Sequence, residues 1–155
     1  MVRNYPETVV EILDDEINYP DELLCVMRIF SASKPWSGSL EARKCKFTDV
    51  NRMMATACRI DKPTLTFGVL NGGSSGSSYY MPGEHRINLT GKLSVVTFLH
   101  EFGHALGMDE QDACKWSINL FRKCFPKQYS RLVHVGHTLI RPQDVRMKIA
   151  QAPVA

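Results

Sequence analysis

Apolar residues recur at every third or fourth position in two segments of the first 62 residues, and this spacing predicts two amphipathic helices. The first helix opens at Pro20 and is broken by residues 31–39, which contain the sequence KPWSG. The second helix is predicted to begin at Thr48, whose side chain can cap it, and to end before Pro63. The apolar positions are Leu23, Leu24, Met27 and Phe30 in the first helix and Val50, Met53, Met54, Ala57 and Cys58 in the second.

The middle of the chain has the pattern of a small sheet. Residues 64–70, with the sequence TLTFGVL, are rich in strand-forming residues, and a Gly- and Ser-rich loop follows over residues 71–78. Residues 79–81 and 85–89 lie on either side of a turn that begins at Pro82. They predict a short hairpin.

Helical spacing returns after Thr90 and predicts three helical segments between there and residue 135. Gly107 is predicted to end the first of these helices in the left-handed conformation, and Asp109 is predicted to cap the next one. Pro126 stops that helix, and a third helical piece is expected over residues 128–135. The apolar stripes consist of Leu93, Val96, Leu99, Gly103 and Leu106 in one helix and of Ala113, Trp116, Leu120, Phe121 and Cys124 in the next.

Helices at both ends of the chain and a small central sheet predict an α+β fold, in which a small antiparallel or mixed sheet packs on a helical layer. The length of 155 residues, with 44% hydrophobic and 23% charged residues, is that of one globular domain. We expect residues 1–62 to form a helical N-terminal part, residues 63–141 to form the functional core, and residues 142–155 to form a loose tail.

Composition narrows the setting in which the protein works. No apolar run approaches the roughly 20 residues that a membrane-spanning helix needs, so we expect no membrane partner. The acidic N-terminus lacks the basic and apolar regions of a secretory signal. Five cysteines without a C-x-x-C pair indicate neither a disulfide framework nor a thiolate zinc site. These features predict a reducing, cytoplasmic location.

Charge is distributed unevenly along the chain, although the net charge is only +3. Residues 1–23 contain seven acidic side chains and one basic side chain, whereas residues 115–155 contain eight basic side chains and one acidic side chain. A basic C-terminal part can contact nucleic acid or an acidic protein. The other interpretation is two solvated faces that attract each other.

Residues 100–104 form the pattern H-E-x-x-H. On a helix, His100 and His104 lie one turn apart on the same face and can both bind one metal ion, while Glu101 flanks a metal-bound water. The alternative is two unrelated histidines on a partly buried helix. The apolar sequence VVTFL before the motif, and the hairpin before that, favour a metal site.

This arrangement resembles the zincin metallopeptidases. Residues 79–113 comprise an extended segment, the motif helix and then the stretch DEQDA, and they look like the compact gluzincin core of ImmA/IrrE-like proteins. SprT-like DNA-associated proteases share the first part but usually take a third histidine. The resemblance implies a zincin-like fold, Zn²⁺ as the cofactor, and hydrolysis of peptide bonds in a protein or peptide substrate.

The family pattern requires a third protein ligand to the metal, and we predict Glu110 for this role. Glu110 projects from the apolar face of its helix, where an unpaired carboxylate would be costly. It follows His104 by only six residues, which is shorter than the usual gluzincin spacing. An unbroken helix would point it away from both histidines, so a bend at Gly107 is required. The spacing also mimics that of metzincins, but no Met-turn follows.

Other side chains compete for the same role. His134 and His137, in the sequence VHVGH, are alternative third ligands. Asp109 is a further alternative, although a helix cap explains it locally.

The resemblance also implies catalytic roles. Glu101 would accept a proton from the metal-bound water as the water attacks the peptide carbonyl, and would then deliver it to the leaving amine. For the developing oxyanion we predict Tyr80 and His137 as donors, with Tyr79 and His134 as alternatives. Ordinary sheet packing is the other interpretation of the two tyrosines.

A function of a different class remains open at this stage. The chain can be a zincin-like binding or regulatory module with a structural metal, which docks on nucleic acid or a partner protein through its basic C-terminal part. Hydrolysis of a non-peptide amide is a third hypothesis, because a metal ion and a carboxylate do not by themselves select a substrate.

Overall fold

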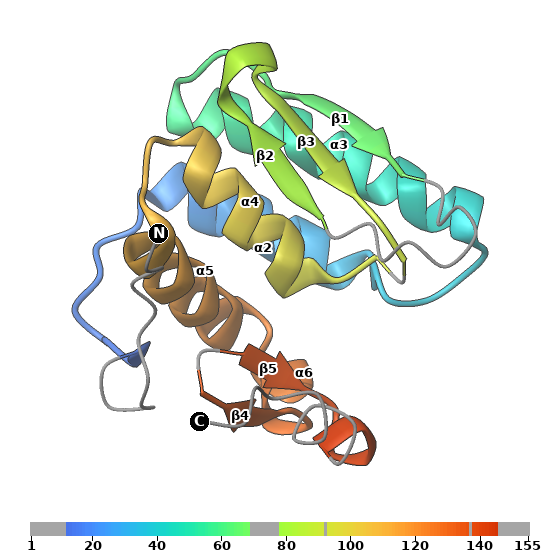
Figure 1. The fold of residues 1–155 in the computed structure, drawn as a ribbon, viewed down its shortest axis with the longest axis vertical. Helices are drawn as coiled ribbons and strands as arrows, with labels where there is room; N and C mark the ends of the chain where they lie inside the picture. The colour runs from blue at the N-terminus through green and yellow to red at the C-terminus, as the bar shows by residue number, and fades with distance from the viewer. Residues whose placement is uncertain (1–11, 69–77, 92, 137, 146–155) are drawn as a thin grey trace, which may run out of the picture.

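The computed structural model describes residues 12–68, 78–91, 93–136 and 138–145, which form an α+β fold (Figure 1). The helices are α2 (Asp21–Ala32), α3 (Leu40–Cys58), α4 (Val95–Ala105), α5 (Glu110–Cys124) and α6 (Pro126–Ser130), with short 3₁₀ turns η1 (Pro82–Glu84) and η2 (Pro142–Asp144). The strands are β1 (Thr64–Phe67), β2 (Tyr79–Met81), β3 (Arg86–Leu89), β4 (Val133–Val135) and β5 (Thr138–Ile140). The predicted fold class is therefore confirmed at this level. None of the described helices has the length and apolar character to cross a bilayer.

The first predicted helix is confirmed as α2, but the predicted start of the second is wrong. α3 begins at Leu40, where the side chain of Ser39 accepts a hydrogen bond from the Ala42 N–H at 3.1 Å. Thr48 lies inside this helix, and its hydroxyl donates to the Lys44 carbonyl at 2.9 Å. A threonine can satisfy its side chain in this way within a helix as well as at its start, so its presence alone did not mark the boundary.

The predicted hairpin is confirmed and belongs to a mixed sheet with the strand order β1-β3-β2. β3 pairs parallel with β1 and antiparallel with β2. β2 is thus an edge strand of the described sheet, and it lies directly before β3 and α4 in the chain. The predicted loop over residues 71–78 and the end of the predicted strand at residues 69 and 70 lie almost entirely outside the described residues.

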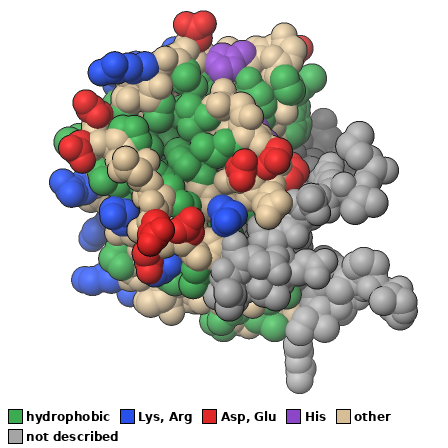
Figure 2. Space-filling model, turned by 90° about the vertical axis from the view of Figure 1, so that its left-hand side faces the viewer, with side chains coloured by type: hydrophobic (Ala, Val, Ile, Leu, Met, Phe, Trp, Pro, Cys, Tyr) green, Lys and Arg blue, Asp and Glu red, His purple; other side chains and the backbone are tan. Residues whose placement is uncertain are grey.

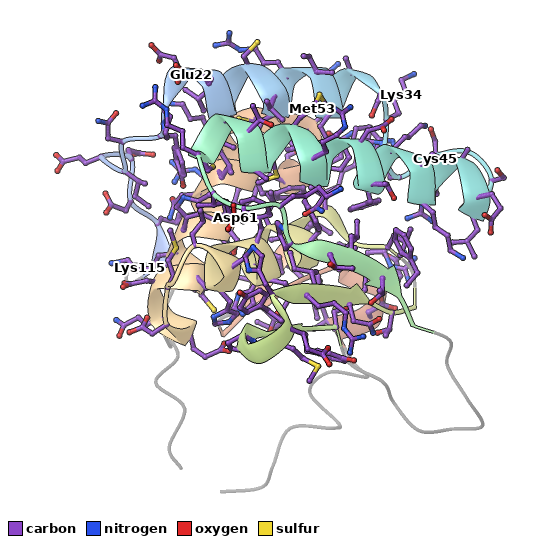
Figure 3. The ribbon with its side chains drawn as sticks, turned by 90° about the horizontal axis from the view of Figure 1, so that it is seen from above. Glu22, Lys34, Cys45, Met53, Asp61 and Lys115 are labelled. Atoms are coloured by element: carbon purple, nitrogen blue, oxygen red, sulfur yellow. The ribbon has the colours of Figure 1, made fainter. Side chains whose placement is uncertain are left out.

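The elements form two layers with the hydrophobic core between them. α2 and α3 lie side by side in one layer, and the three-stranded sheet and α4 form the other (Figures 1 and 3). Within the first layer, Phe47 of α3 makes an edge contact with Phe30 of α2 at a ring separation of 5.3 Å. Phe47 also contacts Phe98 of α4 at 5.6 Å, and this contact connects the two layers. All three rings are almost fully buried. α4 is therefore fixed by its apolar side.

α5 packs against α4 and is also held by the segment before α2. We call residues 12–20 the N-terminal strap. The buried side chain of Asn119 donates to the Ile12 carbonyl at 2.7 Å and accepts from the Asp14 N–H at 2.9 Å. The Tyr19 hydroxyl donates to the Trp116 carbonyl at 2.7 Å. These hydrogen bonds join positions about one hundred residues apart in the chain.

The C-terminal part differs from the prediction. The expected helical piece over residues 128–135 is confirmed only as far as Ser130, where the single-turn α6 ends. Residues 133–135 instead form β4, which pairs antiparallel with β5. Each of these strands has only three residues, too few for alternation to become visible in the sequence. Residues 142–144 of the predicted loose tail form η2, and residues 146–155 lie outside the described residues.

Candidate metal centre

The motif helix α4 and the turn after it are positioned by local signals. The Ser94 hydroxyl caps α4 by accepting from the Thr97 N–H at 3.3 Å. The chain then reverses at Gly107, whose φ of +94° is the left-handed conformation predicted for it. Asp109 caps α5 by accepting from the Asp112 N–H at 2.8 Å. The predicted bend and the predicted cap are both confirmed, and α5 begins at Glu110.

Gly103, inside the motif, allows α4 and α5 to pack closely. A Cβ atom built at this position would lie 3.3 Å from both Cα and Cβ of Ala113, which is tighter than ordinary van der Waals contact. A side chain here would therefore push α5 away from α4. The close approach brings the first turn of α5 against the histidines of α4.

The structure brings His100, His104 and Glu110 together at one point. The two Nε2 atoms of the histidines lie 3.2 Å apart. Glu110 Oε1 lies 2.9 Å from His104 Nε2, and Glu110 Oε2 lies 3.2 Å from His100 Nε2. All three side chains are partly buried, with exposed fractions of 20%, 17% and 32%. The site is thus half enclosed and open on one side.

These separations match the donor set of a tetrahedral zinc site. Zn–N and Zn–O bonds of about 2.0–2.1 Å at tetrahedral angles place neighbouring ligand atoms about 3.3 Å apart. The three observed separations, from 2.9 to 3.2 Å, are close to that value. Two imidazoles and one carboxylate also form the donor type of catalytic zinc sites, which keep a fourth position for water. The residues therefore fit the group that the sequence predicts.

Hydrogen bonding fixes the tautomer of His104. Its Nδ1–H donates to the Met108 carbonyl at 2.9 Å, since a carbonyl can only accept. In the neutral ring, Nε2 then carries the lone pair that faces Glu110 and His100. Metal-binding histidines are typically oriented by such a bond from the second ring nitrogen. The Met108 carbonyl lies in the turn that Gly107 creates.

Cys114 holds the corresponding place beside His100. Its Sγ lies 3.7 Å from His100 Nδ1, and the donor atoms of His100, Glu110 and Cys114 lie within 4.8 Å of one another. Cys114 thus approaches His100 at Nδ1, whereas His104 and Glu110 approach it at Nε2. Burial raises the pKa of this thiol to about 12, and the Glu110 and Glu101 charges contribute. The sequence analysis did not single out Cys114, although its spacing of four from Glu110 places both on one helix face.

Glu101 lies beside the cluster and is 8% exposed. Burial raises its pKa to about 7, while His104 and the Tyr80 backbone N–H act to lower it and Glu110 to raise it. The Tyr80 N–H donates to the Glu101 carboxylate, so the edge strand β2 touches the motif directly. A carboxylate that can gain and lose a proton near neutral pH is suited to general base chemistry.

The Tyr80 side chain is directed to another partner. Its hydroxyl lies 2.7 Å from His85 Nδ1, and His85 Nε2–H donates to the Asp61 carbonyl at 2.6 Å. His85 therefore accepts at Nδ1, and the Tyr80 hydroxyl is the donor. The structure thus connects Tyr80 with Glu101 through the backbone, and its predicted role as an oxyanion donor stays a prediction.

The other predicted site residues have separate environments. His134 on β4 shares a hydrogen bond of 2.7 Å with the Tyr129 hydroxyl, and burial lowers its pKa. Asp109 serves as the cap of α5. Neither His134 nor Asp109 belongs to the cluster around His104 Nε2. His137 lies outside the described residues.

A small cavity opens beside the cluster. Its volume is about 210 Å³, and its walls come from α4, α5 and β5. The wall residues are Val96, Thr97, His100, Glu110, Cys114, Ser117, Ile118, Thr138 and Leu139.

Figure 2 shows the face that lies on the left in Figure 1, where hydrophobic side chains gather centrally and side chains of both charges surround them.

Comparisons with known proteins identify no relative. No protein-family model matches the chain, and no curated protein or solved structure matches it significantly. The interpretation of the site therefore depends on its own geometry and chemistry.

Proposed function

We propose that this protein is a zinc-dependent peptidase with a zincin-like arrangement of its site. The observation that carries the proposal is the convergence of His100, His104 and Glu110 to within 2.9–3.2 Å at their donor atoms, beside the buried Glu101. His100, His104 and Glu110 would hold Zn²⁺. When bound there, the ion would supply an acidified water molecule and polarise the carbonyl that it attacks.

Side chains and backbone groups of the protein would transfer the proton and orient the reacting groups. Glu101 would accept the proton of the attacking water and pass it to the leaving amine. The Tyr80 N–H orients the Glu101 carboxylate for this transfer. The Met108 carbonyl orients the His104 ring, and Cys114 orients the His100 ring. Each contact is made at Nδ1, so that Nε2 remains for the metal.

The position of β2 supports an extended peptide as the substrate. β2 is an edge strand of the described sheet and touches Glu101 through the Tyr80 N–H. An open strand edge offers backbone donors and acceptors along which a peptide can add as another strand. A peptide bound in this way would pass next to the metal centre.

Elemental analysis of the purified protein tests the metal site. We expect about one zinc per chain in the wild type and none in His104→Ala or Glu110→Ala. Asp112→Ala is the matched control, because Asp112 is an exposed carboxylate in the same first turn of α5. Zinc retained in Glu110→Ala, or absent from a wild type reconstituted with zinc, contradicts the proposed ligand set.

Hydrolysis is tested with the substitution Glu101→Gln. This variant should bind zinc like the wild type but cleave a proteome-derived peptide library at least about 100-fold more slowly, as expected for loss of a general base. Mass spectrometry of the digests measures both cleavage and its sequence preference. Undiminished cleavage by Glu101→Gln contradicts the mechanism. Zinc binding without cleavage by the wild type would favour the binding or regulatory module.

A further inference from the structure

A second cavity adjoins the small one beside the metal centre. Its volume is about 730 Å³, within the range of ligand-binding pockets. Val96 and Leu139 line both this cavity and the smaller one at His100 and Glu110. The two cavities therefore adjoin at Val96 and Leu139, and we refer to them together as the groove.

The far part of the groove combines an apolar floor with one available positive charge. Trp36 lies in its wall with 37% of its surface exposed. Arg43 donates to the Pro35 and Leu93 carbonyls, and Arg141 pairs with Asp144 at 2.8 Å. Among the arginines that line this cavity, Arg131 is the one whose guanidinium has no partner among the described residues. It is exposed at the rim.

The groove also has an open strand edge. β5 pairs with β4 on one side, and no other described strand pairs with it on the other. Leu139, in the middle of β5, is one of the two residues that line both cavities. Backbone groups at a strand edge bind the backbone of an extended peptide, whereas a lipid chain offers them no partner. The groove therefore favours a polypeptide occupant.

We infer that this groove holds the part of the substrate that extends beyond the metal centre and β2, and that this part is an extended protein segment with a bulky apolar side chain next to an acidic residue. The apolar side chain packs against Trp36, and the acidic side chain pairs with Arg131. The segment continues past Leu139 to the metal centre, so these residues lie within a few positions of the cleaved bond. This inference rests on the proposed function, because it assigns the specificity of the same site.

Peptide binding tests the inference without relying on cleavage. The probes are three decapeptides composed otherwise of Ala, Ser and Leu. They differ in one central dipeptide, which is Phe-Glu, Phe-Gln or Phe-Lys. Binding to the zinc-loaded Glu101→Gln protein is followed by tryptophan fluorescence, because Trp36 is exposed in the groove while Trp116 is 8% exposed. We expect the Phe-Glu peptide to bind about tenfold more tightly than the Phe-Lys peptide. The signal should vanish in Trp36→Phe.

Two charge reversals separate the role of Arg131 from general electrostatics. Arg131→Glu should reverse the order of affinities. Lys127→Glu, an exposed charge in α6 that does not line the groove, should leave the order unchanged. Equal affinities for the three peptides, or the same effect from both variants, overturns the inference. The inference is also overturned if dodecanoate binds more tightly than every peptide, which would indicate a lipid ligand. It is likewise overturned if the protein is a dimer that dissociates in Arg131→Glu, which would indicate that a second copy occupies the groove.

The failure of this inference can be distinguished from that of the proposed function. If the peptides bind in the expected order but the wild type cleaves none of them, the peptidase proposal is overturned and the peptide-binding role of the groove is retained. Cleavage of all three peptides at equal rates overturns the groove and keeps the peptidase.

Discussion

At the residue scale, the two imidazoles of the candidate centre differ in how their second ring nitrogen is held. His104 donates to the Met108 carbonyl at 2.9 Å, whereas His100 has the Cys114 sulfur at 3.7 Å. A carbonyl is a strong acceptor and a thiol sulfur a weak one. Of these two contacts, the hydrogen bond of His104 is therefore the stronger.

The role of Tyr80 can be tested by removing its hydroxyl. Because this hydroxyl donates to His85 while the backbone N–H bonds Glu101, we expect Tyr80→Phe to lower kcat by less than about tenfold. Loss of a donor to the oxyanion would lower kcat about 100- to 1000-fold. Steady-state hydrolysis of a peptide that the wild type cleaves distinguishes the two roles. Tyr79→Phe is the matched control on the same strand.

At the element scale, the turn between α4 and α5 decides whether the third ligand reaches the histidines. This turn could be predicted from the sequence, because Gly107 favours the left-handed conformation and Asp109 can cap the next helix, and both effects act within a few residues. The same rules failed for the start of α3, where Thr48 bonds within the helix. They also missed β4 and β5. Each strand has only three residues, and the two strands form by pairing with each other.

Substitutions at Gly107 test the importance of this turn. Nothing lies within 4 Å of a Cβ built there, so the effect of a side chain comes from the φ of +94° alone. Gly107→Ala should cost roughly 1–2 kcal/mol of stability and weaken zinc binding. Gly107→Asn should cost less, because asparagine tolerates left-handed conformations. Urea denaturation and zinc titration measure both effects, and equal losses in the two variants would contradict the explanation.

Contacts between elements mark the limit of what the sequence could predict about the site. Glu110 was predicted because helical periodicity and one bend place it. Cys114 was not, because its contact with His100 depends on how closely α5 approaches α4 at Gly103. The cavity beside Leu139 was hidden for the same reason. The spacing of Cys114 from Glu110 places both on one face of α5, but the contact and the cavity themselves depend on how separate elements pack.

At the scale of the whole molecule, the N-terminal strap ties the first described residues to the helix that carries Glu110. Asn119 is 4% exposed and makes two hydrogen bonds to the strap, with Ile12 and Asp14. Arg122 pairs with Asp15 at 2.6 Å, but the Asp15 side chain is 82% exposed. One contact is buried and the other lies in water, so their contributions to stability should differ.

A pair of substitutions on α5 measures this difference. Asn119→Ala leaves buried strap groups without partners and should lower the free energy of unfolding by roughly 2–3 kcal/mol. Arg122→Ala should lower it by no more than about 1 kcal/mol, as is usual for exposed ion pairs. Urea denaturation of both variants compares them directly. Similar losses would mean that the strap contributes little through Asn119.

The strap also sets the shortest fragment in which the candidate centre can be studied. A chain designed to begin at Asp21 keeps every proposed metal ligand, yet it removes the partners of Asn119 and the hydroxyl that meets the Trp116 carbonyl. The polar groups exposed on α5 would then have to be solvated, and the helix that begins at Glu110 would lose its anchorage. A shortened chain for study of the candidate centre should therefore still include Ile12.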